Sequence, residues 1–448
     1  METSYDLIVL GAGPAGRAAA IIASRAGISV IVIEQDGFGG TCPLRGCIPK
    51  KILVAGAETF EHIRRASAQM LEVGPLKLDW AGLIRLKREA IKDIPEAVKN
   101  GFLQLGIDVV QARGGFTGPH TVEAGGREYQ GKKFVIATGS KPRMLPIEGF
   151  ELTTTSDELL EMDDQPSSIV FIGAGPIGME FSHVLSRAGT RVTILEAAPR
   201  ILPGLDKDMT ERLARETRKL GVNIFTGVRI EAIEKAGAAF RVVFAHEGQS
   251  ETLETDVVAN GAGRMADIDG LDLEKALIER DNRGIVTDAF LRTTNKDVFV
   301  AGDAVYTSPQ LSPVATYEGK IVAHNITSSD MITPDYSSVP YVVYTIPELA
   351  GVGMTGDHTK EVKHKVSLLD LSTLKTSRAY AEAATFSKVF IEEGTGKILG
   401  AHILGHRGQE LINIFALAKQ FNITSKDLND FMFAFPTFTS DIKDMLKG

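Results

Sequence analysis

The same order of strand, glycine turn, helix and strand occurs twice in this chain, at an offset of 162 residues. The apolar stretches 6–10 and 168–172 each run into a Gly-x-Gly-x-x-Gly turn, and a further apolar stretch follows at 30–34 and at 192–196. A strand that gives way to a helix after a glycine turn and then returns to a strand is typical of a βαβ unit. The repeat therefore predicts an α/β fold with two Rossmann-like parallel sheets covered by helices.

The glycine turns also carry a chemical prediction. Their glycines are Gly11, Gly13 and Gly16 in the first copy and Gly173, Gly175 and Gly178 in the second. In each copy a carboxylate, Glu34 or Glu196, ends the next strand 23 residues beyond the first glycine. Glycines let the main chain approach a pyrophosphate, the helix N-terminus offers free N–H groups, and the acid accepts from a ribose hydroxyl. Each copy therefore predicts a dinucleotide site.

Cys42 and Cys47 are the only cysteines among 448 residues, and they follow the first copy directly. On an ideal helix a five-residue step separates two Cα atoms by about 8.7 Å, which exceeds the disulfide limit of about 7 Å. The backbone must therefore bend if the two cysteines bridge, and Pro43 and Gly46 between them allow the bend. An isolated pair in a Gly/Pro-rich loop indicates a redox-active disulfide, with two unpaired buried cysteines as the alternative.

The neighbours of each copy indicate which nucleotide it binds. The first copy leads into the cysteine loop, so its nucleotide exchanges electrons with the disulfide, and we expect FAD there. The second copy has no redox residue nearby and is expected to bind the nicotinamide cofactor. Glu196 repels a 2′-phosphate, and the first basic residue after it is Arg200, so NADH is favoured over NADPH.

Composition restricts the class of protein. A formal net charge of -8 argues against a nucleic-acid partner. No apolar run approaches the length needed to cross a bilayer, and the N-terminal residues enter a strand at once without a signal segment. One cysteine pair in so long a chain suits a reducing compartment. We therefore expect a cytoplasmic protein without a membrane or nucleic-acid partner.

These motifs together resemble those of the class I pyridine nucleotide-disulfide oxidoreductases. Members of this family are flavoprotein disulfide reductases of the dihydrolipoamide dehydrogenase, glutathione reductase and mercuric reductase type. The most specific motif is Gly-Gly-Thr-Cys-x4-Cys-Ile-Pro-x-Lys at 39–51. Further family landmarks appear in order along the chain, at 137–142, 263–264, 298–304, 344–348 and 396–402.

The resemblance implies three domains. A flavin domain would comprise residues 1–145 and 264–330, and a nicotinamide-nucleotide domain would comprise 146–263. Residues 331–448 would form an α+β domain that pairs two subunits. Such a protein is a homodimer whose active site is completed by the partner's C-terminal segment.

The resemblance also assigns roles to individual residues. Cys42 would be the interchange thiol that meets the acceptor, and Cys47 would be the thiol that faces the flavin. Lys51, or Lys50 by the glutathione reductase spacing, would pair with Glu180 near the flavin, where a cation stabilises the reduced ring. A helix that starts near Cys47 would lower the thiol pKa. The FAD site would comprise Gly11, Gly13, Gly16, Glu34, Thr41, Lys51, Thr138, Gly139, Ser140, Gly302 and Asp303. The NAD site would comprise Gly173, Gly175, Gly178, Glu196 and Gly263.

One departure from the family bears on the substrate. Members that act on small disulfides carry a His-Pro-Thr segment near the C-terminus, with a glutamate five residues after the histidine. Here Phe435 stands at the histidine position and Ser440 at the glutamate position. Asp441 lies one residue further on, and we expect it to lack an imidazole to orient. Because positioned acid–base catalysis is worth about 10²–10⁴ in rate, efficient turnover of a small free disulfide is not expected.

Phenylalanines replace the acid–base pair. Phe431, Phe433, Phe435 and Phe438 are either core at the subunit interface or, for Phe433 and Phe435, the wall of a dry pocket beside the partner's Cys42. A dry pocket suits an acceptor that needs no protein base, such as a metal ion, a quinone or oxygen. No cysteine follows Cys47, which argues against the mercury handling of mercuric reductase and against a thioredoxin reductase.

The leading hypothesis is an NADH-dependent flavoenzyme, of the disulfide-reductase or metal-reductase type, that passes electrons through Cys42 and Cys47 to a metal ion or small molecule. A divergent dihydrolipoamide dehydrogenase is the alternative enzyme. A flavin redox sensor or complex subunit with little turnover is the alternative of another class. No resident metal ion is expected.

Overall fold

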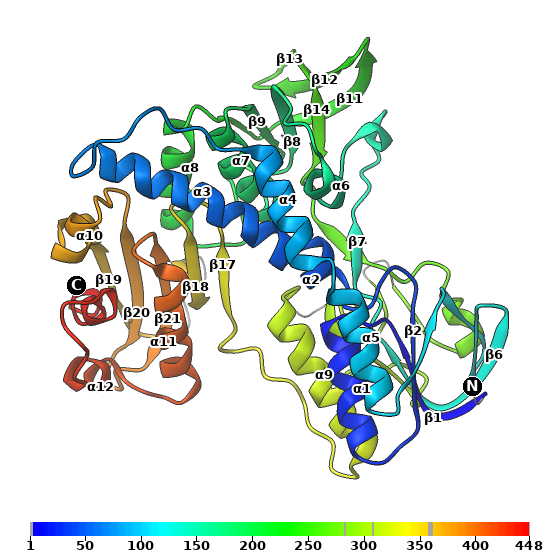
Figure 1. The fold of residues 1–448 in the computed structure, drawn as a ribbon. Helices are drawn as coiled ribbons and strands as arrows, with labels where there is room; N and C mark the ends of the chain where they lie inside the picture. Colours follow the sequence, from blue (N-terminus) through cyan, green and yellow to red (C-terminus); the bar gives the residue numbers. More distant parts are fainter. Residues whose placement is uncertain (1–2, 282–283, 307–308, 357–361, 448) are drawn as a thin grey trace. The chain divides into compact units, whose positions relative to one another are not determined.

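A computed structural model describes residues 3–281, 284–306, 309–356 and 362–447 (Figure 1). The chain forms two compact units, each built from three segments. The first unit comprises 1–50, 86–143 and 264–336, and the second comprises 51–85, 144–263 and 337–448. The domain bounds predicted from the sequence remain a proposal, since residues 51–85 fall in the second unit. Among the described residues, no helix combines the length and apolar character that a bilayer crossing requires.

The first unit contains the first nucleotide-binding sheet, in the strand order β3-β2-β1-β6, with β16 paired to β6. The strands are β1 (Ser4–Leu10), β2 (Val30–Glu34), β3 (Asp108–Gln111), β6 (Arg127–Ile136) and β16 (Val298–Val300). These strands pair in parallel, and β2 is buried along its whole length. Continuous apolar stretches are typical of such strands, because helices cover both faces of a parallel sheet. Two short strands continue the sheet: β5 (Thr121–Ala124) pairs antiparallel with β6, and β4 (Gly114–Gly118) pairs antiparallel with β5.

Helices α1 (Pro14–Arg25) and α9 (Ser312–Thr327) pack against each other in this unit. The crossing is close at Gly319, where an added Cβ would lie 2.2 Å from the main-chain oxygen of Ala15. Only glycine allows this approach, so α9 is held firmly beside the helix that follows the first glycine turn. Two further helices complete the unit, α2 (Thr41–Arg45) and α5 (Ile94–Gln104), while α3 (Cys47–Ser67) and α4 (Trp80–Ile91) run from one unit into the other.

The second unit repeats the same architecture. Its parallel strands β8 (Ser168–Ile172), β9 (Arg191–Glu196), β10 (Asn223–Thr226) and β14 (Val257–Asn260) lie in the order β10-β9-β8-β14. A three-stranded antiparallel sheet follows, formed by β11 (Arg229–Ala236), β12 (Ala239–His246) and β13 (Gln249–Thr255). The flanking helices are α6 (Ser156–Glu161), α7 (Pro176–Ala188) and α8 (Lys207–Lys219). The predicted repeat of a parallel α/β unit is confirmed.

The C-terminal part of the second unit is an antiparallel sheet in the order β17-β18-β21-β20-β19. Its strands are β17 (Pro340–Val343), β18 (Leu349–Gly353), β19 (His364–Asp370), β20 (Phe386–Glu392) and β21 (Ile398–Leu404). The helices of this part are α10 (Lys375–Ala379), α11 (Gly408–Gln420), α12 (Ser425–Asp430) and α13 (Ile442–Met445), with the short 3-10 turn η6 (Phe438–Asp441) before α13. Helix α11 packs on β18 and β21 and closes a separate apolar core. The predicted fold class, two dinucleotide-binding units with an α+β C-terminal domain, is confirmed.

Candidate active site

The first glycine turn forms a cradle that admits no side chain. Gly11 has a φ of +108°, and a Cβ there would lie 2.2 Å from the main-chain oxygen of Ala137. A Cβ at Gly16 would lie 2.0 Å from the main-chain oxygen of Gly11. The Glu34 carboxylate accepts from the main-chain N–H of Ala12 at 2.7 Å and of Asp36 at 2.8 Å. The acid is thus fixed beside the bare backbone that a pyrophosphate and ribose require.

The second glycine turn reproduces this geometry at the same offset. Gly173 has a φ of +106°, and a Cβ there would lie 2.4 Å from the main-chain oxygen of Gly261. The Glu196 carboxylate accepts from the main-chain N–H of Ala174 at 2.6 Å and of Ala198 at 2.7 Å. The two cradles therefore use equivalent main-chain donors, and the chain carries two similar nucleotide sites.

Arg200, the first basic residue after Glu196 in the sequence, forms hydrogen bonds within its own part of the chain. Its guanidinium donates to the main-chain oxygens of Pro203 and Leu205, both at 2.6 Å, and to the Thr210 hydroxyl at 3.2 Å. A guanidinium held by these acceptors is oriented for the loop rather than for a 2′-phosphate.

The two cysteines lie in a bent segment that rests on the first cradle. Helix α2 begins at Thr41 and ends at Arg45, Gly46 follows it, and α3 begins at Cys47. Gly46 has a φ of -140° and a ψ of -111°, which breaks the helix between the two thiols. At Gly40, with a φ of +72°, an added Cβ would lie 2.5 Å from the Cα of Gly13. The predicted bend is present, and the close approach of two glycines packs the cysteine loop against the nucleotide cradle.

Both cysteines are free thiols, and they interact with each other. A hydrogen bond from Cys47 and a smaller contribution from a hydrogen bond of Ser312 together lower the pKa of Cys42 to about 6, against the effect of burial. The same interaction, together with burial, raises the pKa of Cys47. Helix α3 does begin at Cys47, as predicted, but the thiol with the lowered pKa is Cys42, because the pair shares one proton and Cys47 holds it.

Ser312 is a functional residue that the sequence analysis missed. It is the first residue of α9 and hydrogen-bonds to Cys42. Nothing in its local sequence distinguishes it from an ordinary helix start, and 270 residues separate it from Cys42. The nearest signal was the motif at 298–304, which places the chain beside the first cradle shortly before α9.

The motif that contains Thr138 and Ser140 meets the motif that contains Gly302 and Asp303. The Ser140 hydroxyl donates to the Asp303 carboxylate at 2.8 Å, and the Arg264 guanidinium donates to that hydroxyl at 2.9 Å. The hydroxyl of Thr138 is buried and has no hydrogen-bond partner among the described residues. A bare glycine cradle next to an unsatisfied hydroxyl fits a large polar cofactor such as FAD.

The turn at Gly302 is held by residues that the sequence analysis did not identify. The fully buried Glu318 carboxylate accepts from the main-chain N–H of Gly302 and from the hydroxyl of Tyr336, both at 2.6 Å. Gly302 has a φ of +76°. A buried acid in the middle of α9 thus fixes the turn that presents Asp303.

The remaining predicted glycines lie at the crossing strands. Gly139, with a φ of +72°, precedes β7 (Ser140–Pro142), and Gly263, with a φ of +95°, precedes β15 (Arg264–Ala266). The two strands pair antiparallel. Both glycines therefore supply the left-handed turns at which the chain passes from one nucleotide-binding region to the other.

Lys51 and Glu180 both contact Tyr344. The Lys51 ammonium lies 4.3 Å from the centroid of the Tyr344 ring, pairs with Glu58 at 3.3 Å and donates to Gln409 at 2.9 Å. The Glu180 carboxylate accepts from the main-chain N–H of Tyr344 at 2.8 Å. The ion pair that Lys51 forms is thus with Glu58, and the pairing of Glu180 with Lys51 or Lys50 stays a prediction.

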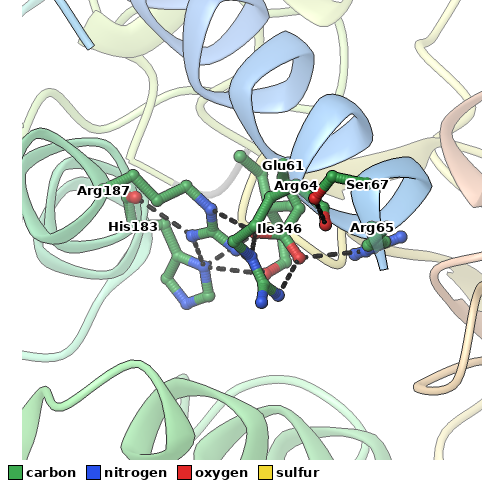
Figure 2. A network of polar contacts seen from close by, with 7 residues as sticks. All are labelled: Glu61, Arg64, Arg65, Ser67, His183, Arg187 and Ile346. Atoms are coloured by element: carbon green, nitrogen blue, oxygen red, sulfur yellow. Dashed lines mark hydrogen bonds and ion pairs between the residues drawn. The ribbon is translucent and has the colours of Figure 1, made fainter. Parts of the chain in front are cut away.

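A buried ionic network joins α3 to α7 (Figure 2). Arg187 of α7 pairs with Glu61 of α3 at 3.3 Å and donates to the main-chain oxygen of Ile346 at 3.0 Å. Burial alone would raise the pKa of Glu61, but Arg64, Arg187 and Arg65 lower it to about 2. His183 is fully buried, which lowers its pKa to about 3, and it hydrogen-bonds to Ile346. The network holds the segment that carries Tyr344 against α7.

The phenylalanine-rich segment divides into exposed and anchored side chains. Phe435 is 79% exposed and Met432 is 90% exposed. Phe433 and Phe438 instead pack against the C-terminal core. Of the two predicted pocket residues, Phe435 projects outward and Phe433 supports the segment from within its own subunit.

The expectation that Asp441 lacks an imidazole is wrong. Nε2 of His406 lies 3.0 Å from a carboxylate oxygen of Asp441, because η6 brings that residue against the turn after β21. His406 is fully buried and does not reach solvent. His402, by contrast, is buried within β21, and its ring contacts the main-chain oxygen of Met354 at 2.7 Å.

Two nucleotide cradles, one of them in contact with a dithiol turn, define a pyridine nucleotide-dependent redox flavoprotein. A model of the pyridine nucleotide-disulphide oxidoreductases matches residues 5–319, and a model of the dimerisation domain of these enzymes matches residues 339–446. The chain belongs to this family of oxidoreductases, which depend on FAD and a pyridine nucleotide and form homodimers. The resemblance drawn from the sequence motifs is confirmed.

Curated relatives and solved structures agree with this assignment. The chain is 31% identical to a dihydrolipoyl dehydrogenase of Bacillus subtilis (strain 168), over 99% of this chain and 97% of the relative. It is 30% identical to a mercuric reductase of Lysinibacillus sphaericus, over 99% of this chain and 82% of the relative. The HOCl-induced flavoprotein disulfide reductase RclA from Escherichia coli superposes with a TM-score of 0.89 at 27% identity, over 99% of both chains. A Cu(II) complex of RclA superposes with a TM-score of 0.90 at 27% identity, over 100% of this chain and 99% of that one.

Proposed function

We propose that this protein is an NADH-dependent FAD oxidoreductase that passes electrons through Cys42 and Cys47 to a metal ion, with Cu(II) as the first candidate. Two features together support this proposal. A reactive thiol pair lies beside the first glycine turn, and Phe435 stands where enzymes that act on small disulfides have a histidine. The Cu(II) complex of RclA, which covers the whole of this chain, supports the choice of metal.

The residues of the first unit would hold FAD. The cradle of Gly11, Gly13 and Gly16 would bind the pyrophosphate, Glu34 the ribose, and Asp303 the ribityl-phosphate region. FAD, when bound, supplies two-electron exchange between a nicotinamide and a disulfide. Thr41, Thr138, Gly139, Ser140 and Gly302 complete the proposed site.

The residues of the second cradle would hold NADH. Glu196 would accept from the free 2′-hydroxyl of the adenosine ribose and repel a 2′-phosphate. Arg200, the first basic residue after Glu196 in the sequence, donates hydrogen bonds to three acceptors near its own loop. These bonds hold the guanidinium there and not at such a phosphate. The second site therefore favours NADH over NADPH.

The proposed reaction at the two thiols needs no side chain that acts as a general base. One NADH and one proton convert the Cys42–Cys47 disulfide to the dithiol and release NAD⁺. The dithiol then gives one electron to each of two Cu(II) ions, the S–S bond forms again, and two protons pass to water. Because Cys42 has a lowered pKa, it is already a thiolate near neutral pH and is a ligand for a soft metal ion.

The test is steady-state NADH oxidation by the FAD-loaded protein with Cu(II), a quinone, oxygen and lipoamide in parallel. A Cu(I) chelator measures the metal product, and Cys42→Ser is the matched thiol variant. We expect Cu(II) reduction that depends on Cys42 and lipoamide turnover at least about 10²-fold slower, as the missing acid–base pair requires. Turnover of lipoamide as fast as that of Cu(II) would contradict the proposal.

A divergent dihydrolipoamide dehydrogenase is the second candidate. The specific observation in its favour is the 31% identity to the Bacillus subtilis enzyme over nearly the full length of both chains. The same assay separates it, since it predicts lipoamide as the preferred substrate. A protein that reduces once with NADH and then stops with every acceptor would instead be the redox sensor or complex subunit.

The domain bounds, the homodimer and the cytoplasmic location expected from the sequence belong to this proposal. In the homodimer, the segment around Phe435 would reach the partner's Cys42. The exposed position of Phe435 supports this arrangement, because a side chain that fills its own core would be buried.

A further inference from the structure

The turn between β21 and α11 has a backbone that ordinary residues avoid. Gly405, His406 and Arg407 adopt consecutive positive φ angles of 63°, 57° and 57°. For residues with a Cβ, the left-handed region is unfavourable, because the Cβ comes too close to the following carbonyl oxygen. Such strain persists only where the surrounding contacts determine the conformation. The side chains of this turn must therefore make contacts that hold it.

His406 makes these contacts through both ring nitrogens. Nδ1 lies 2.9 Å from the hydroxyl of Ser377, and Nε2 lies 3.0 Å from the carboxylate of Asp441. The same carboxylate oxygen accepts from the hydroxyl of Thr376. The fully buried His406 thus links Asp441 to Ser377 of α10 through hydrogen bonds inside the domain.

The aromatic ring of Phe438 is held by the same turn. The His406 ring meets it edge to face, with 4.8 Å between centroids, and the Tyr380 ring lies 5.4 Å away. The guanidinium carbon of Arg407 lies 5.8 Å from its centroid. Phe438 and Asp441 are therefore both fixed by His406, at the two ends of η6.

The segment just before η6 carries the exposed side chains. Phe431, Met432 and Phe435 project from it, whereas Phe433 packs inward and meets the Phe431 ring edge to face at 4.9 Å. Large apolar side chains are unfavourable in solvent, yet three of them are exposed on this segment, which is held in place at η6. Presentation to another surface explains this exposure.

We propose that His406 is a positioning residue, which holds residues 431–441 so that Phe435 is presented to the electron acceptor at the partner's thiol pair. The proposal rests on the proposed function for the identity of the acceptor. It does not make His406 an acid–base group, because a fully buried imidazole cannot touch an acceptor in solvent. His406 and Asp441 thus form an imidazole–carboxylate pair that holds the segment and does not supply the missing acid–base chemistry.

The experiment compares His406→Leu, which loses both hydrogen bonds, with His406→Gln, whose amide can still donate to Asp441. Asp441→Asn removes the negative charge of the carboxylate that His406 contacts. This variant tests the same contact if His406→Leu fails to fold. His402→Gln is the control for general loss of stability, because it changes a buried histidine of β21 whose ring nitrogens meet Tyr341 and Met354.

Two measurements are made on the FAD-loaded dimer. Hydrogen–deuterium exchange of peptides within 431–441 should be about tenfold faster in His406→Leu, because a lost buried hydrogen bond weakens local structure. The rate of flavin reduction by NADH should stay within about twofold, whereas kcat/KM for Cu(II) should fall about tenfold or more, since small misplacement costs up to about 10²-fold. His406→Gln should lie closer to the unchanged protein in both.

Unchanged exchange and an unchanged Cu(II) rate in His406→Leu would overturn the proposal, and so would an equal effect of His402→Gln. Failure of the proposed function looks different. In that case the unaltered protein would not reduce Cu(II), while the exchange measurement would still report whether His406 anchors the segment.

Discussion

The thiol of Cys47 donates a hydrogen bond to the sulfur of Cys42. Because the bond stabilises a thiolate on Cys42 and keeps the proton on Cys47, it makes the two cysteines chemically unequal. The inequality agrees with the role that the family resemblance gives to Cys42, the thiol that meets the acceptor. It also gives the active site a titration that can be measured directly.

Alkylation of the reduced protein should depend on pH through Cys42. Its pKa of about 6 means that the thiolate, and with it the rate of reaction with iodoacetamide, is gained as pH rises through 6. Mass spectrometry should find the label on Cys42 first. In Cys47→Ser the hydroxyl is a weaker partner for the thiolate, so the midpoint should move to higher pH. A midpoint near that of a free thiol, about 8.5, in the unaltered protein would contradict the hydrogen-bond assignment.

Ser312 should contribute to the same titration. Its hydrogen bond stabilises the Cys42 thiolate, so Ser312→Ala should raise the pH at which alkylation is half-maximal. Ser312→Thr keeps the hydroxyl at the start of α9 and is the matched control. If the alanine and threonine variants titrate alike, the hydroxyl is not a partner of the thiolate.

The coenzyme preference should follow Glu196 rather than Arg200. Glu196→Ser removes the charge that opposes a 2′-phosphate, so the ratio of kcat/KM for NADPH to that for NADH should rise about tenfold or more, as like-charge contacts cost several kcal/mol. Arg200→Lys should leave that ratio within about twofold, because Arg200 is bound to its loop. Steady-state kinetics with both coenzymes check this, and a strong loss of NADPH use in Arg200→Lys would show that Arg200 binds the phosphate.

The buried network around Glu61 should be essential for stability. Glu61→Gln leaves the buried guanidinium of Arg187 without its charge partner, which typically costs about 3–5 kcal/mol. Thermal unfolding should occur at a clearly lower temperature than in Glu58→Gln, the control three residues nearer the start of α3. An equal unfolding temperature for the two variants would contradict this account.

The same network predicts how stability depends on pH. The folded-state pKa of Glu61, about 2, lies below its ordinary value of 4.5, so its contribution is present above pH 4.5 and is lost as pH falls toward 2. The loss in Glu61→Gln should therefore be largest near neutral pH and should shrink in acid. A difference that is constant with pH would argue against a charged Glu61.

The sequence predicted the parts of this molecule that depend on local pattern. The glycine turns, the strand-end acids and the bend at Gly46 each follow from neighbours within a few residues, so their geometry was foreseeable. Two of the most informative contacts are not local. Ser312 meets Cys42 across 270 residues, and His406 meets Asp441 across 35, with no spacing that signals either contact. The division of the phenylalanines also needed the structure, because Phe433 and Phe435 are alike in sequence and differ only in packing.

The most direct test of the central claim mixes the FAD-loaded protein with NADH in the absence of oxygen and follows the absorption spectrum. The account predicts rapid bleaching of the yellow flavin by one equivalent of NADH, followed by recovery of the colour as the electrons pass to the cysteine pair, and the recovery should be absent in Cys47→Ser. A flavin that NADH does not bleach, or a recovery that survives in Cys47→Ser, would contradict the route from NADH through FAD to the cysteine pair.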